Sequence, residues 1–309
     1  MWASTDQTWL AFLRFNQGRL HATLYSGFED WLTANEVGNP QDLGRCVLLP
    51  SSYFGGPRQQ QQQYQDAMAI TRFLKKIDLF ITIAANPNWS EITWELLTGQ
   101  TSYDRPDIVA QVFKMKKEEL MDDIYKKHIF GRIVAYVYVV EFQKRCLPHL
   151  YLLIVLDNNN QLRTSADIDS CILAQWLDLR SQPLLFNTVK STMVHGPCGN
   201  LNPSAPCMEN GRCTKGYPKP FQNCTSTNQD GYPSYARPDD GQCFAVTISG
   251  IGNIEVDNHW IVPYNPYISA KFHCHTNVES IAMFRTIKYC FKYITKDLIK
   301  QLYNTITTK

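Results

Sequence analysis

The sequence predicts an α+β fold in which a central, partly antiparallel sheet is flanked by helices and carries a cysteine-rich loop insertion. Three observations predict it. Residues 79–84 form a compact apolar run ahead of the first long helix. Residues 133–142 and 149–156 are β-rich and are separated by a short segment that includes Pro148, which predicts an antiparallel hairpin. Residues 107–127 have helical periodicity, with Asp107 as the expected N-cap.

The remaining elements complete the predicted order along the chain. We expect short helices within residues 8–32, a helix at 168–177, strands at 244–248 and 259–262, and a C-terminal helix at 281–302. These elements predict an N-terminal helical region (1–76), a main domain (77–302) that includes the cysteine-rich segment 193–243, and a short tail (303–309).

Composition bounds the function only loosely. The 309 residues include 30 Lys and Arg against 28 Asp and Glu, so any basic surface has to be local. No apolar run approaches the roughly 18 residues that a membrane span needs, and the N-terminus lacks the pattern of a secretory signal. We therefore expect an intracellular protein without a membrane partner. In a reducing compartment, clustered cysteines indicate metal binding before disulfides.

The predicted hairpin carries a candidate metal site. On a strand, residues two apart share a face, so His149 and Tyr151 point the same way, and a turn near Arg145 would place Glu141 across from them. A carboxylate and an imidazole that converge from neighbouring strands can hold Mg²⁺ or Mn²⁺. The alternative is a half-buried strand with an ordinary histidine and a surface glutamate.

The C-terminal helix carries two tyrosines one turn apart, Tyr289 and Tyr293. They lie about 150° from the apolar stripe of that helix, at about 100° per residue, so they do not face the same core. Either they have a function or they are packing residues, and the lysine stripe beside them is either functional or a solvated face. The neighbouring lysines, also one turn apart, are Lys288, Lys292, Lys296 and Lys300.

The cysteine-rich segment offers a second candidate metal site. His195, Cys198, Cys207 and Cys213 could complete one tetrahedral zinc site. The first pair has favourable spacing, whereas the gaps to the other two cysteines are longer than in common zinc fingers. Free thiols in a loop are the alternative.

These motifs resemble those of the Rep (helicase-like) domain of Helitron transposons, in the HUH endonuclease superfamily. The segment 134–151 is similar to the family's metal motif, and 288–296 to its catalytic motif. The resemblance implies an HUH/Rep-like core, with Mg²⁺ or Mn²⁺ held by His149 and Glu141, nucleophiles Tyr289 and Tyr293, and assisting lysines Lys292 and Lys296. The family chemistry is attack of a tyrosyl oxygen on single-stranded DNA, which leaves a 5′-phosphotyrosine and a free 3′-hydroxyl.

One departure from the family pattern bears on activity. The family's second metal-binding histidine is replaced by Tyr151. A neutral phenol is a poor ligand, and ionising it at pH 7 costs roughly 4 kcal/mol because its reference pKa is near 10. We therefore predict a weak or absent Mg²⁺ or Mn²⁺ site and little nicking.

The resemblance extends over about 250 residues through short segments in the family order: 55–58, 64–68, 86–89, 104–107, 193–221, 260–267 and 275–279. Within them, Trp89 and Tyr267 are either packing residues or rings that stack on unpaired DNA bases, and Lys288 and Lys300 are expected to hold phosphate. His273 and His275 form a second His-x-His pattern, ranked below the hairpin because it lacks the preceding proline and strand pair.

Two functions follow as hypotheses from different classes. The leading one is a Helitron-derived Rep domain for rolling-circle transposition, nuclear, with impaired nicking. The alternative is a non-catalytic module that binds single-stranded DNA, and a purely structural zinc domain is a third possibility. Family members continue into a Pif1-like helicase, but the sequence contains no Gly-x-x-x-x-Gly-Lys-Ser/Thr loop, so we expect any helicase to be separate or lost.

Overall fold

A computed structural model describes residues 2–16, scattered positions between 49 and 69, and residues 77–281 except 143–146, 197, 228–232 and 249–251. The chain divides into two compact units, one of residues 1–69 with 295–309 and the other of residues 70–294. In the first unit the structure describes one helix, α1 (Trp2–Phe15). The sites discussed below belong to the second unit.

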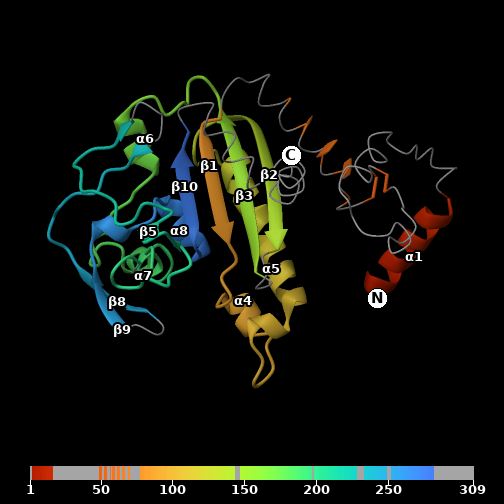
Figure 1. The fold of residues 1–309 in the computed structure, drawn as a ribbon. Coiled ribbons are helices and arrows are strands. Elements are labelled where there is room, and N and C mark those ends of the chain that lie inside the picture. Colours follow the sequence, from red (N-terminus) through yellow and green to blue (C-terminus); the bar gives the residue numbers. More distant parts are fainter. Residues whose placement is uncertain are drawn as a thin grey trace. The chain divides into compact units, whose positions relative to one another are not determined.

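The second unit is an α+β structure built on a four-stranded sheet with strand order β10-β1-β3-β2 (Figure 1). All the pairings in this sheet are antiparallel. The strands are β1 (Leu79–Ala84), β2 (Ile133–Phe142), β3 (Pro148–Leu156) and β10 (Thr276–Ser280). The predicted hairpin is therefore confirmed, and the compact apolar run at 79–84 forms β1, while β10 was not predicted.

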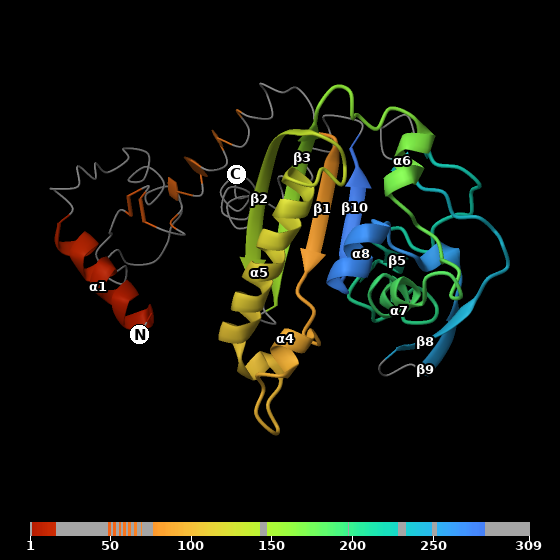
Figure 2. The same cartoon turned by 180° about the vertical axis from the view of Figure 1, so that it is seen from behind.

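One face of this sheet is covered by α5 (Pro106–Tyr125), which Figure 2 shows lying across it. The apolar side chains that face α5 alternate along β3, and Leu150, Leu152 and Ile154 are at most 1% exposed. The residues between them, such as His149 and Tyr151, point to the opposite face. The period of 2 in β3 therefore separates the core from the face that carries the candidate Mg²⁺ or Mn²⁺ ligands.

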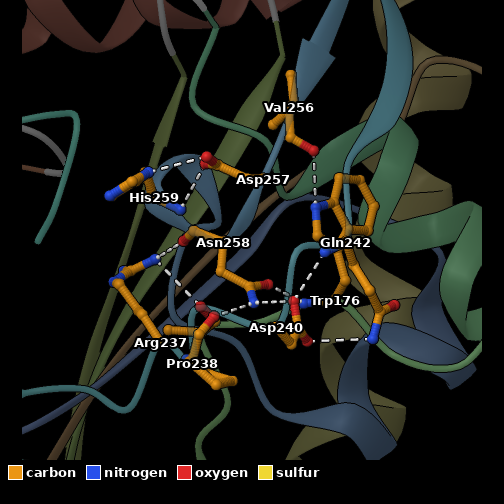
Figure 3. A network of polar contacts seen from close by, with 10 residues as sticks. Trp176, Arg237, Pro238, Asp240, Gln242, Val256, Asp257, Asn258 and His259 are labelled. Carbon is orange, nitrogen blue, oxygen red and sulfur yellow. Dashed lines mark hydrogen bonds and ion pairs between the residues drawn. The ribbon is translucent and has the colours of Figure 1, made fainter. Parts of the chain in front are cut away.

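A second core lies beside the β10 edge, under α7 (Pro183–Thr192) and the hairpin of β8 (Phe244–Ile248) and β9 (Gly252–Val256). Within it, the Trp176 ring meets Phe186 at a tilt and Phe244 edge-on. Arg237 connects this region to its surroundings, since its Nη1 donates to the carbonyl oxygens of Ala174, Asn258 and Ile261. Figure 3 shows Arg237 beside Asn258 in this network.

The other elements are short. They are α4 (Ser90–Thr93), η1 (Ser102–Asp104), α6 (Ser165–Cys171), β4 (Met208–Glu209), β5 (Arg212–Cys213), β6 (Ser226–Thr227), β7 (Pro233–Ser234), η2 (Asn258–Trp260) and α8 (Pro266–Phe272). Among the residues described, no helix combines the length and the apolar character needed to cross a membrane.

Three local predictions were wrong. Asp107 is not the N-cap of α5, because Pro106 occupies the first helical position and Asp107 instead pairs with Arg105 at 2.8 Å. The helix expected at 168–177 ends at Cys171, after which Leu173 bridges to Tyr264. The strand expected at 259–262 begins as η2, whose N-cap Asp257 accepts a hydrogen bond from the His259 backbone N–H.

Candidate metal sites

The β2–β3 hairpin places Glu141 directly opposite His149. Both side chains are partly buried, and both point away from α5 because their strand neighbours Val140 and Leu150 pack in the core. The cross-strand register expected from the sequence is therefore present. The pair offers one imidazole and one carboxylate on the same face, which is two of the donor groups that a divalent cation requires.

Tyr151 lies two residues further along β3 on that same face, but it is packed. Its side chain is 5% exposed, and its ring stacks on Phe80 of β1 with centroids 6.3 Å apart and planes 9° apart. The His149 ring lies 6.4 Å from the Tyr151 ring. A buried, stacked phenol does not replace an imidazole donor, so this hairpin does not offer the two-histidine set of the resembled motif.

Strand β10 adds two polar residues to this face that sequence reasoning did not single out as site residues. Asn277 is opposite Thr82 and Glu279 opposite Phe80, so both share the side of the sheet with His149 and Tyr151. The Asn277 Nδ2 donates to Glu279 Oε1 at 2.8 Å, and the Asn277 Oδ1 is a buried acceptor without a hydrogen-bond partner. The sequence carries little signal for this strand, since Val278 between Asn277 and Glu279 is the only apolar residue in 275–279.

The cysteine-rich segment brings four ligand atoms together. The donor atoms of His195, Cys198, Cys207 and Cys213 all lie within 4.8 Å of one another. The His195 Nε2 is 3.7 Å from the Cys198 sulfur and 3.5 Å from the Cys213 sulfur. A tetrahedral zinc ion, with Zn–S of about 2.3 Å and Zn–N of about 2.0 Å, holds nitrogen and sulfur about 3.5 Å apart. The cluster therefore has the donors and the spacing to hold a metal ion.

A tight hairpin explains the long gap between two of the cysteines. Strands β4 and β5 pair Met208 with Cys213 around the turn Asn210-Gly211, whose φ values of 52° and 77° are both positive. Asn-Gly is the preferred sequence for this two-residue turn. The turn folds the five residues between Cys207 and Cys213 back on themselves. An Asn-Gly dipeptide between two cysteines was thus the sequence signal that favoured a site over free thiols.

The electrostatics of the cluster favour neutral His195. Burial, followed by the charges of Lys215, Lys219 and His275, lowers the pKa of His195 to about 4. Because a histidine binds metal through a neutral ring nitrogen, the ring is in the ligating form at neutral pH.

The cysteines differ from one another. Burial raises the pKa of Cys198 to about 12. Burial also acts to raise the pKa of Cys213, but backbone N–H groups of Tyr217 and Lys215 donate to its sulfur and bring the pKa below its ordinary value. Backbone donors that favour the thiolate are the surroundings a metal-binding sulfur needs. The seven cysteines that the structure describes form no disulfide.

Aromatic rings fix the orientation of His195. Its ring stacks on Tyr217 with centroids 4.1 Å apart and planes 11° apart, and it is nearly parallel to Trp260 at 6.5 Å. The Lys219 ammonium lies 5.1 Å from the Tyr217 ring. The imidazole therefore packs against two nearly parallel aromatic rings, and such contacts orient a histidine for ligation.

The two histidines of the second His-x-His pattern contact different residues. The His273 Nδ1 contacts the Thr188 hydroxyl at 2.9 Å, whereas the His275 Nδ1 contacts the Thr192 carbonyl at 2.7 Å. Each ring is therefore engaged with a different residue of α7. Burial lowers the pKa of His275.

The two candidate base-stacking residues have different environments. Trp89 is 5% exposed, its Nε1 donates to the Phe272 carbonyl at 2.7 Å, and its ring stacks on Phe113. Trp89 is therefore a packing residue. Tyr267 is 43% exposed on α8. The catalytic and phosphate-binding candidates, Lys288, Tyr289, Lys292, Tyr293, Lys296 and Lys300, lie outside the described residues.

Comparison with protein families matches residues 1–154 to the model described as "Helitron helicase-like domain at N-terminus". The matched segment includes β1, α5, β2 and most of β3, and hence Glu141, His149 and Tyr151. The cysteine cluster and β10 follow it in the chain. No curated protein matches the sequence.

Proposed function

We propose that this chain, whose residues 1–154 match the Helitron helicase-like family model, is a Helitron-derived Rep domain with impaired nicking. Its ancestral activity is that of a metal-dependent endonuclease and strand transferase for single-stranded DNA, with Tyr289 and Tyr293 as nucleophiles. The family's transposition acts on genomic DNA, so we place the protein in the nucleus. A Pif1-like helicase would act as a separate partner, if it is retained.

The proposal that nicking is impaired depends on the packing of Tyr151. Glu141 and His149 lie opposite each other, but the third position of the motif is a phenol stacked on Phe80 and 5% exposed. In this family a bound cation polarises the phosphate under attack. Two donor side chains are fewer than a dedicated protein site uses, and loss of an imidazole should weaken binding by at least about 10- to 100-fold.

Manganese binding tests this explanation. We expect Tyr151→His to bind Mn²⁺ at least about tenfold more tightly than the parent chain, measured by electron paramagnetic resonance of free Mn²⁺. Tyr151→Phe is the matched control, because it keeps the aromatic ring but supplies no donor atom. A Tyr151→His variant that binds Mn²⁺ no better than the parent would refute the explanation.

A cleavage assay separates the Rep domain from a dead DNA-binding module. Labelled single-stranded DNA is incubated with Mn²⁺ and the Tyr151→His chain, and the covalent protein–DNA adduct is measured after denaturation. The Rep proposal expects an adduct that falls when Tyr289→Phe or Tyr293→Phe is added. Binding without an adduct in any variant favours the module.

The proposal includes a structural zinc ion at His195, Cys198, Cys207 and Cys213, supported by the spacing of their donor atoms. Metal analysis of the purified chain should find one zinc per molecule, and Cys213→Ser should lower this. Cys243→Ser is the matched control, since Cys243 is exposed and outside the cluster. Less than one zinc in the parent chain would remove this part of the proposal.

A further inference from the structure

Three tyrosines line the outer edge of the sheet on the side of α5, and we call them the tyrosine ladder: Tyr125, Tyr136 and Tyr138. The rings of Tyr136 and Tyr138 are stacked, with centroids 6.3 Å apart and planes 18° apart. Tyr125 meets Tyr136 edge-on at 6.3 Å. Neither the Glu141–His149 face nor the cysteine cluster includes these residues.

Local structure explains why these rings lie together. Tyr136 and Tyr138 are two apart on β2 and pair with Ile154 and Leu152, so they point to the same face as the core side chains of β3. Strand β2 is the last strand in the sheet order, and α5 lies beside it (Figure 2). Tyr125 is the last residue of α5. The core side of the edge strand thus extends beyond the helix that covers the rest of the sheet.

The ladder is exposed to an unusual degree for rings that already contact one another. Tyr136 and Tyr138 are each 41% exposed, and Tyr125 is 56% exposed. Their neighbours on the same face of β3, Ile154 and Leu152, are fully buried. Aromatic rings of this size normally remove most of their surface from water. The ladder therefore leaves ring surface open to solvent on β2 and at the end of α5.

Two lysines of α5 supply positive charge next to the ladder. The Lys117 ammonium lies 5.0 Å from the centre of the Tyr138 ring, and Lys114 is one turn earlier. Neither forms an ion pair within the described part of the chain, whereas Lys116, Lys126 and Lys127 each pair with an acid. At about 100° per residue, Lys114, Lys117 and Tyr125 lie within about 80° of one another on the helix, with Glu118 as the acid nearest to them.

We propose that the tyrosine ladder stacks on the bases of single-stranded DNA, while Lys114 and Lys117 hold its phosphates. Sequence-tolerant sites for single strands combine exposed aromatic rings with cations in this way. A duplex has no free base faces to offer, and unpaired lysines favour a polyanion over an apolar protein surface. The inference rests on the proposed Rep function and assigns it a DNA contact on the sheet face opposite His149.

Fluorescence anisotropy with labelled oligothymidylate tests the proposal on the full chain. The double variant Tyr136→Ala/Tyr138→Ala should bind at least about fivefold more weakly, and Tyr136→Phe/Tyr138→Phe should bind like the parent because stacking is kept. Tyr103→Ala is the matched control, since Tyr103 is 52% exposed and outside the ladder. Lys117→Gln should lower the dependence of log K on log[salt] by about 0.7.

The outcomes separate failure of the ladder as the DNA contact from failure of the Rep proposal itself. If the parent binds the oligonucleotide and the double alanine variant binds equally well, the ladder is not the contact, although the Rep proposal stands. If the parent shows no salt-dependent binding, the Rep proposal and the ladder both fall. If the double variant changes the sedimentation coefficient and leaves DNA affinity unchanged, the surface joins two copies of the chain and the inference is overturned.

Discussion

Asp123 is a buried acid that connects two helices on the core side of the sheet. Its side chain is 0% exposed, and its two oxygens accept from Lys127, four residues later, at 2.7 Å and from Lys271 of α8 at 2.6 Å. Lys271 also reaches Glu119 at 2.7 Å. Burial acts to raise the pKa of Asp123, but the two lysines outweigh it and hold the pKa below its ordinary value. The charged form is therefore the stable one in the fold.

Asp123→Asn should lower the free energy of unfolding by about 2–3 kcal/mol. Removing one partner of a buried ion pair commonly costs about 3–5 kcal/mol. The expected loss is smaller because Lys271 keeps Glu119, and because the Lys127 side chain is 60% exposed, so its ion pair is weak. Asp122→Asn is the matched control, since the 54% exposed Asp122 pairs, among the described residues, only with Lys126; this variant should lose less than about 1 kcal/mol.

Urea unfolding at several pH values is the assay. A depressed carboxyl pKa contributes stability above the unfolded value of about 3.9, and this contribution is lost as pH falls through the lower folded value. The difference between parent and Asp123→Asn should therefore be constant from about pH 7 to 5 and shrink below about pH 4. A variant no less stable than Asp122→Asn, or a difference that grows with acid, contradicts the reasoning.

Substitutions at three further positions, Gly211, Arg237 and Trp89, should weaken zinc binding or lower stability. Gly211→Val places a β-branched residue at φ 77° and should weaken zinc binding by about tenfold in a competition with a chromophoric chelator, whereas Gly241→Val, at φ 72° outside the cluster, should not. Arg237→Met should lose about 3 kcal/mol in urea unfolding, because three carbonyls lose a buried donor. Trp89→Ala should lose about 3–5 kcal/mol by the same assay, and Trp89→Phe about 1–2 kcal/mol, for the lost hydrogen bond to Phe272.

Helices and strands whose residues repeat one hydrophobic pattern along their length could be predicted from the sequence. The apolar run of β1, the β-rich hairpin and the long periodic helix α5 each repeat one pattern over many residues. The opposition of Glu141 and His149 followed from that hairpin, because pairing fixes which residues meet. The closeness of the four candidate ligands could only be proposed as one alternative, because cysteine spacing alone does not show where the chain reverses; the Asn210-Gly211 turn indicates one of these reversals.

Short elements were missed because tertiary contacts select them. Helix α8 is seven residues long and starts where the Asn265 side chain accepts from the Ile268 N–H, with Pro266 at the first position. Strand β10 is five residues long and forms by pairing with β1, which is almost two hundred positions earlier in the chain. Because β10 was missed, Asn277 and Glu279 were absent from the expected site.

The packing of Tyr151 predicts that stability and metal binding respond in opposite directions at this position. A tyrosine stacked on Phe80 stabilises the sheet face without a ligand, whereas an imidazole in the same buried place needs a partner for its ring nitrogens. Tyr151→His should therefore unfold more easily than the parent without metal, by about 2 kcal/mol, because it loses ring area and stacking. Mn²⁺ should recover part of this loss in the variant and leave the parent nearly unchanged, since a ligand stabilises only the state that binds it. Thermal unfolding with and without Mn²⁺ measures both effects. If the variant is as stable as the parent without metal, Tyr151 does not stabilise the metal-free sheet face. The presence of tyrosine in place of histidine then needs another physical explanation.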